Sequence, residues 1–176
     1  MEEIYLVKPN ETYLEQIVEY RKEFLEAGSS LDGCGSLART ENAEDWLKQV
    51  EQLANKETVP SNWVQSTQFL SIRKSDNRLV GMIQVRHYFN DFLEKFGGHI
   101  GYSVRPSERQ KGYAKQMLRD CLEYCKEINL EKVLLTCLDS NEGSRKTILR
   151  NNGVYESTVF EPEDKVNLER YWITLR

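Results

Sequence analysis

The chain has 176 residues, of which 39% are hydrophobic and 30% charged, a composition typical of one globular domain with a single core. Its longest apolar run, VLLTCL at 133–138, is far too short to span a membrane, and the start MEEIYLVKP lacks the basic and apolar segments of a secretory signal. The net charge of −4 argues against a broad nucleic-acid interface. We therefore expect a single cytoplasmic domain over residues 1–176, with no membrane or nucleic-acid partner.

The first elements predicted along the chain are a strand and two helices. The strand IYLVKP at 4–9 ends at a proline, after which Asn10 can cap a helix with apolar residues at helical spacing. A loop rich in Gly and Ser follows at 26–39, and it is long enough to be either a functional wall or a simple connection. Asn42 then opens a second amphipathic helix, with apolar residues from Ala43 to Leu53 on one face.

From Thr67 the apolar period changes from helical spacing to two, which predicts strands. TQFLSIRK and RLVGMIQVRHYF flank the polar turn SDN and predict an antiparallel hairpin. A strand GGHIGYSVRP at 97–106 contains Gly101, which indicates a bulge or a close backbone approach. An amphipathic helix at 113–128 and the buried strand KVLLTCLD at 132–139 complete a βαβ unit. A short helix ended by Gly153 and two closing strands, VYESTVFE and LERYWITL, finish the chain.

The four cysteines form no CxxC pair, and only two histidines are present to complete a metal site. Cys121 and Cys125 lie four residues apart on the apolar face of the predicted helix, where a reduced cysteine acts as a small hydrophobic residue. We therefore expect no bound metal.

The turn PSERQKGYAKQ at 106–116 is locally basic, although the chain as a whole is acidic. A strand that enters a glycine-bearing turn and then a helix forms an anion site, because the first N–H groups of the helix have no internal partner. The known nucleotide loops GxxxxGK[ST] and GxGxxG are both absent, since Gly112 is the only glycine between Gly101 and Gly143. The turn therefore predicts a phosphate site of another kind.

The pattern Arg109-x-x-Gly112-x-Ala114, preceded by Val104-Arg105-Pro106, resembles the pyrophosphate-binding motif of the GNAT acetyltransferase superfamily. The segment from Asn141 to Ser144, followed by Asn152-Gly153, resembles the next motif of that family. The resemblance implies an α/β (α+β) fold of GNAT type: a mixed, mostly antiparallel central sheet of about six to seven strands, a βαβ acetyl-CoA-binding core, and helices on both faces.

The resemblance also implies which residues contact acetyl-CoA as a cosubstrate. Backbone N–H groups in the turn would cradle the pyrophosphate, with the side chains of Arg109 and Lys111 adding charge. The backbone of Val104 would pair with the pantetheine arm and polarise the thioester carbonyl, and Asn141 and Ser144 would lie on the other side of the arm. The residues of the cradle are Gln110, Lys111, Gly112, Tyr113 and Ala114. The alternatives are that Arg109 and Lys111 are solvated turn charges and that Asn141 is a helix N-cap, a role compatible with binding.

In this family an amine attacks the thioester directly in a ternary complex, so a base and an acid are both sought. Many relatives supply the acid from a tyrosine at the position that Leu149 occupies here. Tyr155 or Tyr102 would have to replace it, or the thiolate leaves unassisted, since its pKa of about 8.5 is tolerable in a leaving group. His99 and Tyr102 are the candidates for the base, and the alternative for His99 is a structural role.

The resemblance therefore predicts an N-acetyltransferase that acts on a small-molecule or peptide amine. The acidic net charge mildly favours a cationic acceptor. Two other functions stay open: a non-catalytic acyl-CoA-binding or regulatory module, and a phosphate-binding structural protein unrelated to CoA. The last strand carries Tyr171, Trp172 and Ile173, which predict either a homodimer contact, as in some relatives, or ordinary core.

Overall fold

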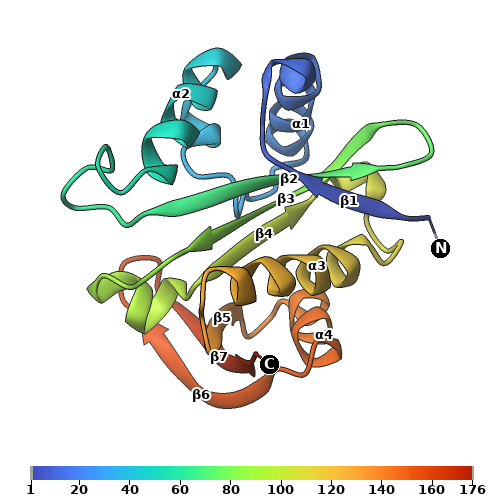
Figure 1. Cartoon of the computed structure of the whole chain (residues 1–176). Helices are drawn as coiled ribbons and strands as arrows, with labels where there is room; N and C mark the ends of the chain where they lie inside the picture. The colour runs from blue at the N-terminus through green and yellow to red at the C-terminus, as the bar shows by residue number, and fades with distance from the viewer. Residues whose placement is uncertain (1, 176) are drawn as a thin grey trace.

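The computed structural model describes residues 2–175. These residues fold, in order, as β1 (Ile4–Val7), α1 (Leu14–Ala27), α2 (Ala43–Ala54), β2 (Ser66–Arg73), β3 (Arg78–Arg86), β4 (Ile100–Val104), α3 (Tyr113–Glu127), β5 (Lys132–Leu138), α4 (Glu142–Arg150), β6 (Val154–Glu161) and β7 (Val166–Thr174). Each predicted helix and strand is present in the predicted order, and its bounds differ by a few residues at most at each end. Figure 1 shows their arrangement.

The seven strands form two antiparallel sheets, ordered β1-β2-β3-β4 and β5-β7-β6. The mixed α/β fold of mostly antiparallel strands is thus confirmed, but the hydrogen-bonded ladder is interrupted between β4 and β5. Just before β4, the backbone N–H of His99 donates to the carbonyl oxygen of Leu134 in β5 at 2.7 Å. Past this contact the two strands belong to separate ladders.

Helices cover both faces of the four-stranded sheet (Figure 1). Helices α1 and α2 pack on one face through Tyr20, Phe24 and Trp46, all of them buried. Helix α3 packs on the other face through the stripe that its spacing predicts, which includes Met117 and Cys121. All four cysteines are buried and free.

Three details refine the predicted elements. Helix α4 is followed by Asn152 at φ 68°, so Asn152 rather than Gly153 has the left-handed conformation. Gly153 is needed for space, because a Cβ there would lie 2.4 Å from Cγ2 of Ile148.

Tyr171 and Ile173 of β7 lie in the core. Between residues 2 and 175, no helix is both long and apolar enough to cross a membrane.

Candidate active site

Among the residues that the structure describes, no ladder of hydrogen bonds joins β4 to β5, and this break between the two sheets is here called the gap. In the β3–β4 ladder the N–H of Arg105 donates to Val80 and the carbonyl of His99 accepts from Arg86. Because backbone groups alternate along a strand, the N–H and C=O of Tyr102 and Val104 face away from β3, toward β5. No backbone hydrogen bond joins these two residues to β5 within the described chain. This edge of β4 therefore has unpaired backbone groups that an extended ligand could bond, apart from the carbonyl of Val104, which accepts from Arg109.

The turn from β4 to α3 has the conformation of an anion cradle. Gln110 and Gly112 both have positive φ, 62° and 85°, so successive peptide groups turn their N–H groups toward one side. Gly112 occupies the N-cap position of α3, and no side chain of the described residues caps this helix. The leading N–H groups of α3, from Tyr113 and Ala114 onward, thus point out of the helix without an internal partner.

A buried carboxylate fixes this turn against the sheet. Glu108 is only 5% exposed and accepts from Arg73 Nη1 at 2.7 Å, Arg78 Nε at 2.6 Å and Lys111 Nζ at 2.8 Å. Burial alone would raise the pKa of Glu108, but the bonds from Lys111, Arg73 and Arg78 lower it to about 2. Arg73 also donates to the hydroxyl of Tyr113, the first residue of α3. Arg73 also pairs with Asp76 at 2.7 Å, so the charges around Glu108 are largely balanced within the protein.

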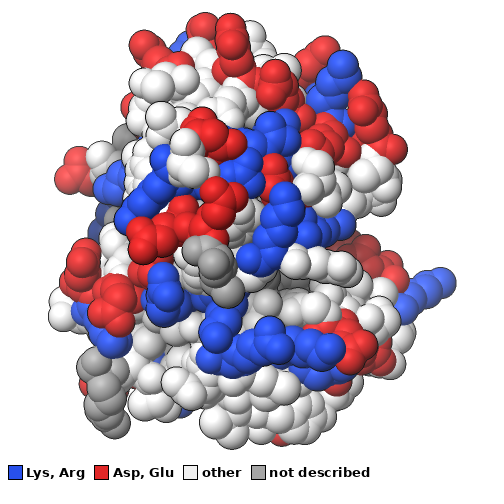
Figure 2. Space-filling view, turned by 90° about the vertical axis from the view of Figure 1, so that its right-hand side faces the viewer, with Lys and Arg blue, Asp and Glu red and all other residues white. Residues whose placement is uncertain are grey.

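The side chains of Arg109 and Lys111 both have partners within the protein. Arg109 donates from Nε to the carbonyl of Val104 at 3.0 Å and from Nη2 to Ser29 at 2.8 Å, and its guanidinium lies over the ring of Phe24. It thus ties the turn to α1. Lys111 pairs with Glu108 but is half exposed. Viewed from the side on which α3 begins, Lys and Arg gather across the middle of the surface, with Asp and Glu more numerous above them (Figure 2).

Three predicted site residues meet across the gap. The hydroxyl of Tyr102 on β4 lies 2.7 Å from Oγ of Ser144 on α4. Oδ1 of Asn141 accepts from the N–H of Ser144 at 3.1 Å, so Asn141 is the N-cap of α4 and its Nδ2 stays available to a ligand. Burial raises the pKa of Tyr102 to about 12, so its phenol is protonated at neutral pH and acts as a hydrogen-bond donor.

His99 joins the two sheets, and its geometry argues against a role as base. Its Nδ1 accepts from the N–H of Leu134 at 2.9 Å, which leaves the ring proton on Nε2. Burial, together with the charge of Arg86, lowers the pKa of His99 to about 4. The ring is therefore neutral at pH 7, and the nitrogen that could accept a proton is already in use.

Tyr155 lies away from the gap, on β6, which β7 separates from β5. Its hydroxyl pairs with Thr158 at 2.7 Å and its side chain is half exposed. The side chain of Leu149, at the position of the usual acid, is also about half exposed. Of the predicted hydroxyls, only that of Tyr102 reaches across the gap.

A second hollow opens on the α1–α2 side of β4, and part of its wall comes from the stretch 26–39, for which a functional wall was one of the two expectations. It has a volume of about 520 Å³ and is walled by the loop 31–35, the segment 62–66 and the segment 90–93. Gln84 and Arg86 of β3 also line it. The sequence signal for this hollow is weak: a polar residue and a basic residue in the apolar strand VGMIQVR.

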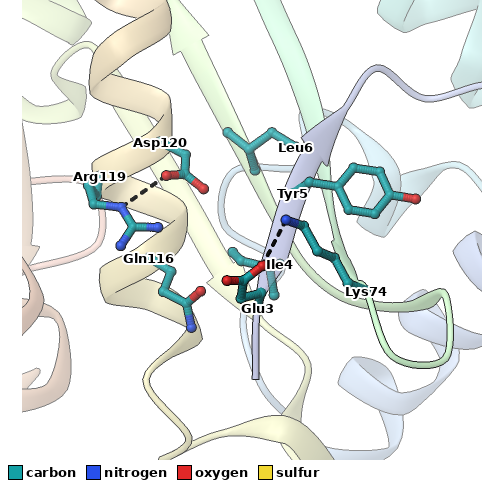
Figure 3. Close-up of a pocket in the computed structure, with 8 residues that line it drawn as sticks. All are labelled: Glu3, Ile4, Tyr5, Leu6, Lys74, Gln116, Arg119 and Asp120. Atoms are coloured by element: carbon teal, nitrogen blue, oxygen red, sulfur yellow. Dashed lines mark hydrogen bonds and ion pairs between the residues drawn. The ribbon is translucent and has the colours of Figure 1, made fainter. Parts of the chain in front are cut away.

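Another hollow, of about 480 Å³, lies between β1 and α3 (Figure 3). Its charged residues are satisfied within the protein, since Lys74 pairs with Glu3 at 2.9 Å and Arg119 with Asp120 at 3.0 Å. In Figure 3 each pair of side chains points toward its own partner rather than toward an open space. None of the residues that line this hollow is one of the predicted site residues.

Comparisons with known proteins agree with this geometry. The chain is 29% identical over 96 residues to the uncharacterized N-acetyltransferase YnaD of Bacillus subtilis, a match that spans 52% of this chain and 54% of YnaD, about half of each. Its fold is similar to RimL, the ribosomal L7/L12 alpha-N-protein acetyltransferase solved in complex with coenzyme A. That match has a TM-score of 0.73 and 14% identity, and it covers 98% of this chain and 94% of RimL.

A further structure with this fold is the ribosomal-protein-S5-alanine acetyltransferase of Vibrio fischeri, with a TM-score of 0.74, 14% identity and coverage of 99% and 94%. The model of the acetyltransferase (GNAT) family matches residues 36–153, which contain the β2–β3 hairpin, the gap and the turn before α3. This chain therefore belongs to the GNAT acetyltransferase family.

Proposed function

We propose that the protein is an N-acetyltransferase that moves an acetyl group from acetyl-CoA to the amine of a small molecule or peptide. The observation that carries the proposal is the junction of two features: an open edge on β4 and, directly after it, the uncapped turn at Gly112. The edge of β4 suits an extended arm that bears amide groups, and the turn at Gly112 suits a pyrophosphate. Their order along the chain matches the order of these two parts in acetyl-CoA.

The residues present fit this cosubstrate. The N–H groups of residues 110–114 would hold the pyrophosphate, and the half-exposed ammonium group of Lys111 would add attraction. The open N–H and C=O groups of Tyr102 and Val104 would pair with the arm, although Arg109 already donates to the carbonyl of Val104. The fit is supported by RimL, which has the same fold and was solved with coenzyme A.

Bound acetyl-CoA supplies the activated acetyl group, and the products are an N-acetyl amide and the thiol of CoA. Tyr102, whose hydroxyl lies 2.7 Å from Oγ of Ser144, would donate a hydrogen bond to negative charge that develops in the gap. Its raised pKa makes full proton transfer to a thiolate unfavourable, because a thiol with an ordinary pKa of about 8.5 is the stronger acid. In this proposal Tyr102 stabilises charge, and the amine proton leaves through water.

The test of acetyl-CoA binding is thermal unfolding with and without acetyl-CoA. At ~100 times its dissociation constant the ligand adds roughly 2.7 kcal/mol, which raises Tm by several degrees. Gly112→Asp places a side chain and a negative charge in the cradle and should abolish this shift. Asn129→Asp is the matched control, because Asn129 also has a left-handed φ, of 65°, but lies beyond the other end of α3.

Two further measurements separate the alternatives. A shift with acetyl-CoA but not with ADP at equal concentration requires recognition of the arm, and equal shifts would favour a general phosphate site. Release of CoA thiol with a panel of amines establishes catalysis. A protein that binds acetyl-CoA and acetylates no amine would instead be the binding module that Leu149, in place of the family's tyrosine, favours.

A further inference from the structure

The hollow on the α1–α2 side of β4, here called the Arg86 pocket, lies directly behind the gap. Side chains alternate along β4, so Gly101 faces this pocket while Tyr102 faces the other way. Gly33 of the 31–35 wall packs against Gly101, since a Cβ added at Gly101 would lie 3.4 Å from Cα of Gly33. The same Cβ would lie 3.2 Å from Nη2 of Arg86. The guanidinium thus lies over β4 next to Tyr102.

Arg86 has no carboxylate partner within 4 Å among residues 2–175. Its Nη1 donates to the carbonyl oxygens of Gly97 at 3.2 Å and Gly98 at 3.5 Å, and its Nε and Nη2 have no acceptor in the same part of the chain. Most other arginines whose side chains are not exposed form ion pairs, although Arg21 donates to the carbonyl oxygens of Leu37 and Ala38 instead. The ion pairs are Arg73 with Asp76 and Glu108, Arg78 with Glu108, Arg105 with Glu19 and Glu23, Arg145 with Glu169, and Arg170 with Glu156.

This arrangement leaves part of the guanidinium of Arg86 without a partner among residues 2–175. Burial lowers the pKa of Arg86 to about 10, with Asp32 acting in the opposite direction from the loop. Arg86 is partly exposed, and a guanidinium with two unused donors is stabilised by an anion that accepts from both, as a carboxylate does in a bidentate manner. Arg86 lines the pocket.

The rest of the pocket defines the body of its ligand. Trp63 and Phe92 are both about half exposed, and they line the pocket with Leu31, Leu53 and Leu93. Such a lining suits an apolar group. The loop adds one carboxylate, Asp32, which can attract an ammonium group. The pocket therefore offers a cation, an anion and an apolar surface.

We propose that the acceptor is a small amine that also carries a carboxylate, as an apolar amino acid does, with the carboxylate bound by Arg86 and the apolar part against Trp63 and Phe92. This inference rests on the proposed acetyl transfer and names its substrate class. It replaces the expectation from net charge, because the charge next to the gap is positive although the whole chain carries −4. A polyamine, which has no anionic group, would leave Arg86 unpaired.

The test compares each amino acid with its own amide, which has the same body and no carboxylate. Suitable pairs are L-phenylalanine with L-phenylalaninamide, L-leucine with L-leucinamide, and β-alanine with β-alaninamide, with spermidine as a cationic competitor. CoA thiol release is measured at saturating acetyl-CoA. We expect kcat/KM to be at least about tenfold higher for the acid in at least one pair, a difference typical of one charged contact.

Arg86→Gln should bring the acid-to-amide ratio close to one, mainly by raising KM for the acid, and Arg86→Lys should restore part of it. Thermal stabilisation by acetyl-CoA is measured on all three proteins as a separate readout. If that stabilisation is absent from the wild type, the proposed function fails. If it is present and the amides or spermidine react as well as the acids, only the inference about Arg86 fails.

The inference also fails if Arg86→Gln lowers turnover of acid and amide equally, because Arg86 is then a structural residue. A last outcome is that no acid is acetylated. Stabilisation of the acetyl-CoA complex by millimolar L-phenylalanine, lost in Arg86→Gln, would then still support the assigned pocket chemistry. Its absence for every carboxylate in the panel would overturn the proposal.

Discussion

Glu108→Gln is expected to destabilise the fold strongly, because it leaves three basic groups facing a neutral amide. Arg73, Arg78 and Lys111 all donate to this one buried carboxylate. The pKa of Glu108 falls from an ordinary 4.5 to about 2, and at ~1.36 kcal/mol per pKa unit this corresponds to about 3 kcal/mol of stability at pH 7. For a domain of this size, Tm should fall by roughly 6 to 12 °C.

The dependence on pH distinguishes this reason from a packing defect. A depressed carboxyl pKa adds stability that is fully present above about 4.5 and is lost as pH falls toward 2. Urea unfolding of the wild type and of Glu108→Gln should therefore differ by about 3 kcal/mol at pH 7 and by roughly half of that or less at pH 3. Glu163→Gln, on the exposed β6–β7 turn, is the control and should change little at either pH. A deficit that is the same at both pH values would refute the electrostatic explanation.

Three more changes test other parts of the structure. His99 should contribute about 3 kcal/mol to the loss of stability between pH 6.5 and 4, because unfolding lets it take up a proton that its folded pKa of about 4 excludes, and His99→Gln should reduce the slope in urea titrations by that amount. Gly33→Ala should cost roughly 2 kcal/mol or more, since its Cβ would lie 2.3 Å from the carbonyl oxygen of Gly101; Gly28→Ala, at a similar φ with no atom within 4 Å, should cost less. Tyr102→Phe should lower kcat by about tenfold or more while the Tm shift with acetyl-CoA persists, and an unchanged kcat would remove Tyr102 from the chemistry.

The order of elements could be predicted because each carries its own local signal. The stripe from Ala114 to Cys125 has the helical period, and the turn before it has basic residues around a glycine. The sequence also placed a close backbone approach at Gly101, which the contact with Gly33 confirms. These signals are local, so a single sequence carries them.

The parting of β4 and β5 could not be predicted, because the apolar run of β5 shows burial on both faces and says nothing of which strand lies beside it. The roles of charged side chains were also hidden. Arg109 binds Ser29, which is 80 positions away, and Arg86 lacks a carboxylate only because no distant segment brings one. His99 shows the same limit, since its tautomer is set by the amide of Leu134. Such partners come from segments that are distant in the sequence and meet only in the folded structure.

Because the ladder between β4 and β5 is interrupted, ligand binding should affect the cooperativity of unfolding. In the described part of the chain, the four-stranded and the three-stranded sheet are not joined by a ladder between β4 and β5, and a backbone hydrogen bond links them at His99 and Leu134. A ligand that pairs with β4 acts as the missing strand, so its hydrogen bonds become part of the secondary structure. The amides of Tyr102 and Val104 should then exchange with solvent quickly in the free protein and slowly in the complex. Occupancy would thus change the cooperativity of the whole fold.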